Sequence, residues 1–335
     1  MLDTFPPALA RRSAPLVTFF GCDPEEARAI EDIARRRSVR CRIQEAPLGL
    51  ESAALARGTS CVSVNHLTPV VGDTMRALAE NGVRHLLTRS IGVDHLDLEL
   101  AASLGLTVAN IPYDPDGVAD YTVMLMLMAL RHARPTLAAT ERHDFRVTPP
   151  RGRELRSVTV GVLGAGRIGR AVVARLRGFG CRILVVSESG REVEGAESVP
   201  LQRALTESDI LTLHLPLNER TRHYLSAERL ALLRPGALLV NTGRGGLVDT
   251  DALVHALEDG RLGGAALDVL DGEERCFSSD HSGRALPHPE LARLIALPNV
   301  IVTPHAAYFT TRTLHQVVET TLSRCVDLER RTLHV

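Results

Sequence analysis

The sequence predicts an α/β protein with two Rossmann-like, doubly wound parallel-sheet domains, and three observations support this fold class. Short apolar runs alternate with helical patterns along most of the 335 residues, as in parallel sheets covered by helices. The alternation occurs in two series, one in the first third of the chain and one that begins at Val158. The length is enough for two ordinary domains.

The first series is predicted to contain four strands, at residues 16–20, 61–64, 86–88 and 107–110, and two helices, at residues 24–37 and 74–80. One long helix is then predicted over residues 117–134, which are rich in Val, Leu, Met and Ala. We expect Met124, Met126 and Met128 to be buried in the core, because methionine fills irregular gaps.

The second series is predicted to contain six strands, at residues 158–163, 183–186, 210–213, 238–241, 265–269 and 300–303. Helices are expected to begin near Arg167, Leu201, Ala227 and Thr250. This layout is typical of a dinucleotide-binding domain. The segment from about Thr310 is also helical, and we expect it to return to the first domain.

The charge balance gives no indication of a polyanionic partner, because 39 basic residues stand against 40 acidic ones and the net charge is -1. The most apolar stretch, residues 123–130, is too short to cross a bilayer. The N-terminus lacks the charged lead and long apolar core of a signal peptide. We therefore expect a cytoplasmic protein with no nucleic-acid or membrane partner.

Lysine is absent, so all 39 basic residues are arginines. The absence excludes Schiff-base lysine chemistry, a phosphate-binding P-loop lysine and a lysine general base. The six cysteines are scattered, without the CxxC spacing of a zinc site or a redox pair. We therefore expect no metal site, and we expect buried or incidental thiols in a reducing compartment. The chemistry must rest on histidine, arginine and carboxylates.

A glycine-rich turn follows the first strand of the second series and leads into a helix. In this context Gly164 permits a tight turn, Gly166 lets the backbone approach a pyrophosphate, and Gly169 lets the helix pack closely on the strand. The first turn of that helix, at Arg167 and Ile168, offers free N–H groups to the phosphates. The motif therefore predicts NAD or NADP as the cofactor.

The residue that contacts the cofactor ribose is expected about 20 residues further on, where NAD-preferring proteins usually carry an acid. This place is occupied by Ser187. Ser187 and Ser189 can donate hydrogen bonds to a 2′-phosphate, and Arg191 can form an ion pair with it. Glu188 leaves the alternative open, since its carboxylate can bind the 2′-hydroxyl of NADH. We expect NADPH to be used at least as well as NADH.

Three further segments end predicted strands with residues that can carry chemistry. Arg244 lies in a glycine-rich loop, where its guanidinium can form a two-pronged ion pair with a substrate carboxylate. Asp268 and Glu273 follow the next strand, and His305 follows the last one. Ligands of doubly wound sheets bind at the carboxyl ends of the strands, so these side chains are expected to belong to one site.

The stretch from Arg89 to about Arg330 resembles the D-isomer-specific 2-hydroxyacid dehydrogenase family, because GAGRIG, NTGRGG, ALDVLDGEE and TPHAAY stand in that family's order. Within the family it is most similar to the VanH-type D-lactate dehydrogenases of glycopeptide resistance, through segments such as VADYTVMLMLMALR and LGGAALDVL. Before about residue 85 the resemblance is loose. It implies a flavodoxin-like substrate domain, formed by residues 1–113 and 308–335, and an NAD(P)-binding domain, formed by residues 114–307.

The resemblance implies that Arg244, Glu273 and His305 form the catalytic set. Arg244 fits the arginine that holds the substrate carboxylate and polarises its carbonyl. His305 fits the acid–base residue, which protonates the keto oxygen as hydride arrives at carbon two. Glu273 fits the carboxylate that pairs with this histidine and keeps its acid form available near neutral pH.

The remaining contacts that the resemblance implies involve both domains. For the substrate they are the backbone N–H groups of Ile91 and Gly92, which receive the carboxylate, and the rings of Tyr113 and Tyr308. For the cofactor they are His214, Leu215, Pro216, Thr242 and Asp268, the last of which lies beside the nicotinamide carboxamide. The resemblance also implies a homodimer built across the long helix after Gly117.

We therefore expect the chain to reduce pyruvate to D-lactate with NAD(P)H, and to supply D-lactate for D-alanyl-D-lactate peptidoglycan precursors. One alternative is the same chemistry on another 2-keto acid, as in hydroxypyruvate or glyoxylate reductases. A more distant alternative is a dinucleotide-sensing corepressor, because this fold also serves such proteins. A turnover assay with pyruvate discriminates between the enzyme and the corepressor.

Overall fold

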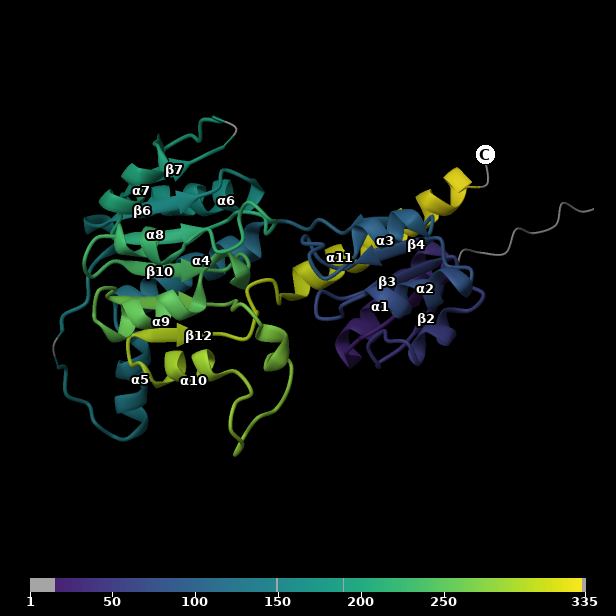
Figure 1. The fold of residues 1–335 in the computed structure, drawn as a ribbon, viewed down its shortest axis with the longest axis horizontal. Helices are drawn as coiled ribbons and strands as arrows, with labels where there is room; N and C mark the ends of the chain where they lie inside the picture. Colours follow the sequence, from purple (N-terminus) through teal and green to yellow (C-terminus); the bar gives the residue numbers. More distant parts are fainter. Residues whose placement is uncertain (1–15, 149, 189, 333–335) are drawn as a thin grey trace, which may run out of the picture. The chain divides into compact units, whose positions relative to one another are not determined.

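The chain forms two compact units, which Figure 1 colours along the sequence. A computed structural model describes residues 16–148, 150–188 and 190–332. The first unit combines Met1–Tyr113 with Thr311–Val335, and the second is Asp114–Thr310. The chain therefore leaves the first unit once and returns to it once.

The first unit is built on a five-stranded parallel sheet with the order β2-β1-β3-β4-β5. Its strands are β1 (Leu16–Phe19), β2 (Arg40–Ile43), β3 (Cys61–Val64), β4 (His85–Thr88) and β5 (Thr107–Asn110). Its helices are α1 (Pro24–Arg37), α2 (Gly72–Glu80), α3 (Leu98–Ser103) and α11 (Thr311–Thr332), with the 3₁₀ turn η1 (Ser52–Ala56). Within β3, Cys61 packs with α1 and α11 whereas Val62 packs with α2, as the period-two alternation of a strand requires. The sheet is therefore a middle layer with helices on both faces.

The second unit is built on a seven-stranded parallel sheet with the order β12-β11-β10-β9-β6-β7-β8. Its strands are β6 (Thr159–Leu163), β7 (Arg182–Val186), β8 (Glu197–Ser198), β9 (Ile210–Leu213), β10 (Leu238–Asn241), β11 (Gly264–Leu267) and β12 (Val300–Val302). β6 lies between β7 and β9, which is the switch point at which doubly wound sheets bind ligands.

Helices cover both faces of the second sheet. They are α4 (Asp116–Leu130), α5 (Ala133–Glu141), α6 (Arg167–Leu176), α7 (Leu201–Glu207), α8 (Ala227–Ala231), α9 (Thr250–Glu258) and α10 (Pro289–Ala296). Four 3₁₀ turns, η2 (Leu155–Ser157), η3 (Arg177–Phe179), η4 (Gly245–Leu247) and η5 (Glu273–Arg275), join them. α4 and α6 share one buried cluster, and α7 to α10 share the other.

The single long helix predicted over residues 117–134 is interrupted at Arg131 and His132. α4 ends at Leu130, and α5 begins after His132, whose backbone φ is +49°. A left-handed residue cannot continue a right-handed helix, and the apolar pattern gives no signal of it. Met126 is buried, and Met128 packs against the same cluster, but Met124 is 39% exposed. Neither α4 nor any other helix in the described parts of the chain is long and apolar enough to cross a membrane.

Besides α5, the sequence prediction missed two strands and two helices, all of them short. β2 is an edge strand in which exposed residues alternate with half-buried ones, and β8 has only two residues, both exposed. α3 has six residues and α10 has eight. Elements of this length contain too few residues for a hydrophobic period to stand out.

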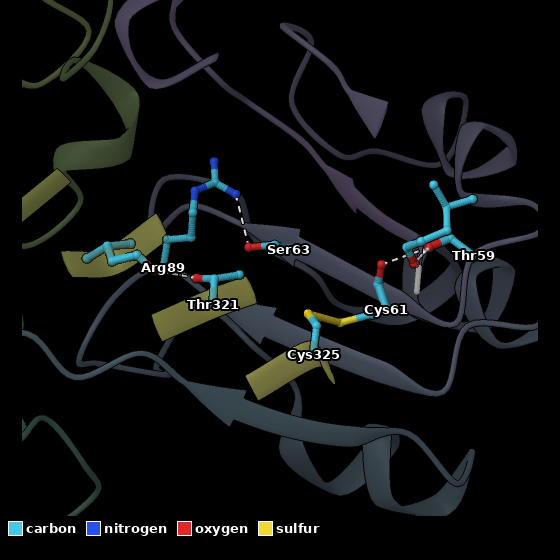
Figure 2. The surroundings of a disulfide bond; sticks show 8 residues. Thr59, Cys61, Ser63, Arg89, Thr321 and Cys325 are labelled. Carbon is cyan, nitrogen blue, oxygen red and sulfur yellow. Dashed lines mark hydrogen bonds between the residues drawn. A yellow bond between two sulfur atoms is a disulfide. The ribbon is translucent and has the colours of Figure 1, made fainter. Parts of the chain in front are cut away.

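Cys61 of β3 and Cys325 of α11 form a disulfide inside the first unit. Both residues are fully buried, and Figure 2 shows the bond between the strand and the helix. The prediction of thiols is wrong for this pair, because 264 positions separate the two cysteines and no local spacing reveals their contact. The other four cysteines are free thiols.

Candidate active site

A histidine and a glutamate are held together in the second unit. His305 follows β12, and Glu273 begins η5. Nδ1 of His305 lies 2.6 Å from Oε1 of Glu273, and only 14% and 18% of the two side chains is exposed. Oε2 of Glu273 accepts a 2.7 Å hydrogen bond from the backbone N–H of Leu270. The carboxylate is therefore fixed at both oxygens, and its position fixes the imidazole.

The turn that carries His305 is held by hydrogen bonds to the buried carboxylate of Asp268. Asp268 directly follows β11 and is fully buried. It accepts hydrogen bonds from the hydroxyl of Thr303 at 2.6 Å and from the N–H groups of Ala306 and Ala307 at 2.8 and 2.9 Å. The N–H of His305 donates to the Asp268 carbonyl at 2.8 Å. These bonds hold His305 at a φ of +53°, which residues other than glycine rarely adopt.

Arg244 lies on the loop between β10 and η4, and the side chain of Asn241 clamps this loop. Nδ2 of Asn241 donates to the Arg244 carbonyl at 3.0 Å, and Oδ1 accepts from the N–H of Gly243 at 3.0 Å. A Cβ on Gly245 would lie 2.0 Å from the carbonyl carbon of Leu270. Glycine at this position therefore lets the arginine loop pack against the segment that precedes η5.

Two further contacts involve predicted site residues. The ring of Tyr308 meets the ring of His305 edge to face, with 5.9 Å between centroids and an interplanar angle of 83°. The hydroxyls of Thr242 and Thr122 lie 2.7 Å apart, and Thr122 donates to the carbonyl of Val118. Because a hydroxyl carries one proton, Thr242 donates to Thr122. α4 is thereby joined to the arginine loop.

The glycine-rich turn between β6 and α6 has the shape that a dinucleotide requires. Gly164 has a φ of +107°, and a Cβ on it would lie 2.4 Å from the carbonyl oxygen of His214. A Cβ on Gly169 would lie 1.9 Å from the carbonyl oxygen of Gly164. A Cβ on Gly166, the N-cap of α6, would meet nothing within 4 Å, and no side chain caps the helix. The helix N-terminus therefore fits the pyrophosphate of NAD.

Other predicted cofactor residues follow the neighbouring strands β7 and β9 or begin α6. Ser187 follows β7 and is half-buried, whereas Glu188 and Arg191 are exposed. Ser189 lies outside the described residues. The remaining ones are Arg167 and Ile168, which begin α6, and His214, Leu215 and Pro216, which follow β9. Burial lowers the pKa of His214 to about 4, so its imidazole is neutral near neutral pH.

Three of the predicted substrate contacts lie in the first unit. Tyr113 is half-buried against the cluster that α1 and α11 share. Ile91 and Gly92 lie in the loop after β4, and the described part of the chain provides no hydrogen-bond acceptor for their N–H groups. Adjacent N–H groups of this kind are suited to bind an anion such as a carboxylate. The predicted substrate contacts are therefore divided between the two units.

Sequence reasoning gave no role to Thr122, Asn241 or Thr303, although each holds part of this site in place. Asn241 lies just before the loop that carries Arg244, and Thr303 lies just before the turn that carries His305. A polar residue at the end of an apolar strand was the sequence signal that could have indicated both of them. Thr122 gave none, because it lies 120 positions from its partner Thr242. The contact exists only in the folded chain.

Comparisons with known proteins agree with this geometry. The model of the D-isomer specific 2-hydroxyacid dehydrogenase NAD-binding domain matches residues 123–307. A D-specific alpha-keto acid dehydrogenase of Enterococcus faecium is 46% identical, over 95% of this chain and 98% of that protein. A D-lactate dehydrogenase structure from Treponema pallidum matches with a TM-score of 0.83, 28% identity and coverage of 94% and 97%. An NAD-complexed D-isomer specific 2-hydroxyacid dehydrogenase from Lactobacillus delbrueckii ssp. bulgaricus matches with a TM-score of 0.79, 30% identity and coverage of 94% and 97%.

The matched residues make up more than half of the chain, and the Enterococcus relative is similar along nearly all of it. The predicted fold class, two α/β domains with parallel sheets, is confirmed. The chain belongs to the D-isomer specific 2-hydroxyacid dehydrogenase family, and it is an NAD-binding oxidoreductase of small 2-hydroxy and 2-keto acids.

Proposed function

We propose that the chain reduces pyruvate to D-lactate, and that Arg244, Glu273 and His305 carry the reaction. The 2.6 Å contact between Glu273 and His305 supports this most directly. Protonation of a keto oxygen needs an acid whose position and proton are both secured, which a histidine paired with a fixed carboxylate supplies. The names of the relatives, a D-specific alpha-keto acid dehydrogenase and a D-lactate dehydrogenase, favour this substrate.

When held at the glycine-rich turn between β6 and α6, NADH or NADPH would supply a hydride for carbon two of the keto acid. His305 donates the proton on Nε2 to the keto oxygen, because Nδ1 is engaged by Glu273. The carboxylate of Glu273 accepts the hydrogen bond from Nδ1–H and so holds the ring with Nε2 available for the substrate. In the oxidation of D-lactate, Nε2 takes the proton back.

Arg244 holds the substrate carboxylate and polarises the neighbouring carbonyl, because a planar guanidinium can donate two parallel hydrogen bonds. The N–H groups of Ile91 and Gly92 provide further donors for the same carboxylate. The rings of Tyr113 and Tyr308 limit the room for the substrate side chain. The edge-to-face contact of Tyr308 with the His305 ring supports a position beside the reacting carbonyl.

For the cofactor, we infer that NADPH is used at least as well as NADH. Ser187 stands where the ribose is contacted and carries no charge that would repel a 2′-phosphate. Arg191 is exposed a few positions further on and can pair with that phosphate. Glu188 is also exposed, and its carboxylate is the feature that favours NADH instead. Thr242 and Asp268 are assigned to the nicotinamide half.

We propose that the D-lactate enters D-alanyl-D-lactate peptidoglycan precursors, as in resistance to vancomycin. The similarity to the Enterococcus keto acid dehydrogenase over nearly the whole chain supports this role. A reductase of another 2-keto acid, such as hydroxypyruvate or glyoxylate, is the alternative. The site geometry described above is common to both, so the choice depends on measured substrate preference.

We also propose a homodimer built across the region that follows Gly117. α5 has no buried residue, and beyond it Phe145 and Val147 are 74% and 101% exposed. Neighbouring exposed apolar side chains of this size mark interaction surfaces. A second copy packed on this region would cover them. Sedimentation should give a dimer, and Phe145→Asp should shift it towards the monomer.

A panel of 2-keto acids, assayed with NADH and with NADPH, tests the proposal. We expect the highest kcat/KM with pyruvate and D-lactate as the product in a stereospecific assay. A higher kcat/KM with hydroxypyruvate or glyoxylate would favour the alternative substrate. Binding of the dinucleotide without turnover of any keto acid would favour a dinucleotide-sensing role.

A further inference from the structure

The loop after β4 contains the N–H groups that the proposed function assigns to the substrate carboxylate. In a planar trans peptide, the carbonyl of one residue and the N–H of the next point in opposite directions. A hydrogen bond accepted by the carbonyl of Ser90 therefore orients the N–H of Ile91. A bond accepted by the carbonyl of Ile91 orients the N–H of Gly92 in the same way.

Both of these carbonyls accept hydrogen bonds from the end of β5. The N–H of Ile111 donates to the carbonyl of Ser90 at 3.0 Å. Nδ2 of Asn110, the last residue of β5, donates to the carbonyl of Ile91 at 2.8 Å. The first contact is made by backbone and does not depend on residue type. The second depends on the asparagine side chain.

We propose that Asn110 is a positioning residue, whose amide orients the N–H of Gly92 for the substrate carboxylate. This inference rests on the proposed function, because it needs Gly92 to contact that carboxylate. Asn110 itself touches no reacting atom in this scheme. It acts through the peptide between Ile91 and Gly92.

The backbone around Asn110 is held in place by its neighbours, which fixes the origin of the side-chain amide. Nη1 of Arg324, on α11, donates to the Asn110 carbonyl at 2.7 Å. The peptide that follows Asn110 is therefore held at its oxygen by α11 and at its nitrogen by the loop. The hydroxyl of Ser90 donates to the carbonyl of Gly92 at 2.7 Å, which fixes the following peptide as well.

The start of the loop is anchored independently of Asn110. Arg89 is almost fully buried, and its guanidinium pairs with Glu26 at 2.7 Å. It also donates to the hydroxyl of Ser63 at 3.2 Å, as Figure 2 shows. Removal of the Asn110 amide should therefore leave the loop folded and loosen mainly the peptide that carries the Gly92 N–H.

Asn110→Ala tests the inference through the Michaelis constants. We expect the KM for pyruvate to rise roughly fivefold, as the loss of one ordinary hydrogen bond produces, while kcat changes little. The KM for NADH and NADPH should not change. Asn110→Asp keeps the size but replaces the donor by an acceptor, so it should raise the KM for pyruvate further. The Asp variant also serves if Asn110→Ala does not fold.

Asn81→Ala is the matched control. Asn81 is also half-buried in the first unit, and its Nδ2 donates to the carbonyl of Ala53 at 3.2 Å. We expect a similar loss of thermal stability in Asn81→Ala with no change in KM. An unchanged KM for pyruvate in the folded Asn110 variants would overturn the inference. An equal rise in the KM for pyruvate in the Asn110 variants and in Asn81→Ala would also overturn it. Absence of keto acid turnover in the unmodified protein would instead overturn the proposed function, and this inference with it.

Discussion

Glu273 contacts His305 at 2.6 Å through one carboxylate oxygen, while the backbone of Leu270 holds the other oxygen at 2.7 Å. A carboxylate fixed in this way cannot rotate away from the imidazole. The contact therefore persists through the reaction that we propose, and it determines which ring nitrogen carries the mobile proton. Its consequences can be measured.

Glu273→Gln should lower kcat/KM for pyruvate roughly tenfold or more, because a neutral hydrogen bond replaces the charged one that holds the imidazole. The amide can also turn its NH₂ group towards Nδ1, which leaves Nε2 poorly oriented for proton transfer. Steady-state kinetics with saturating cofactor measure the loss, with the exposed neighbour Glu274→Gln as the control. An unchanged kcat/KM in Glu273→Gln would mean that the histidine acts without this carboxylate.

Arg244→Lys should reduce kcat/KM for pyruvate by on the order of a hundredfold, because the charged pair loses its second hydrogen bond. Lysine retains the positive charge but cannot form the planar, two-pronged contact. Steady-state kinetics with saturating cofactor measure the loss. Arg220→Lys, at an exposed position, is the control. Near-normal kinetics in Arg244→Lys would mean that the carboxylate is bound elsewhere.

Ser187→Asp should shift cofactor preference towards NADH. The new carboxylate can accept hydrogen bonds from the ribose hydroxyls and repels a 2′-phosphate. The ratio of kcat/KM for NADPH and NADH measures the shift, and Glu188→Gln tests the competing carboxylate. If the unmodified protein already prefers NADH about tenfold and Glu188→Gln abolishes that preference, Glu188 contacts the ribose.

The cofactor-free protein should lose stability as the pH falls from 6.5 towards about 4. Burial lowers the pKa of His214 to about 4, and its Nδ1 is buried with no hydrogen-bond partner among the described residues. In this window the unfolded chain binds a proton that folded His214 does not bind, so acid favours unfolding. Urea unfolding at neutral and mildly acidic pH measures the slope. His214→Gln should flatten it, and parallel slopes would contradict the assignment.

Much of the fold could be predicted, because its central strands are short apolar runs followed by recognisable turns. β3, β5, β9 and β10 lie where the sequence indicates them. Placing Arg244 and His305 at the ends of strands needed no more than that pattern and the rule for ligand sites in parallel sheets. The break at His132 could not be predicted, because a left-handed residue in an apolar stretch has no signal in hydrophobic periodicity.

Contacts between residues far apart in the chain also could not be predicted from the sequence. Asp268 could be proposed as a site residue from the sequence, but its three hydrogen bonds to the turn that carries His305 could not be foreseen. Thr122 and Thr242 form one contact only because α4 packs beside β10. Such roles depend on geometry that local patterns do not contain.

The disulfide between Cys61 and Cys325 closes part of the polypeptide into a covalent ring. The ring is large, because the two positions are 264 apart. The whole Asp114–Thr310 unit lies inside this ring, with both of its connections to the first unit. A protease that cuts one bond between the two cysteines would open the ring without releasing a fragment. On a gel, the pieces of a singly nicked chain should therefore separate only after treatment with a thiol reductant. In the unfolded chain, a closure of this length removes enough freedom to favour folding by roughly 5 kcal/mol.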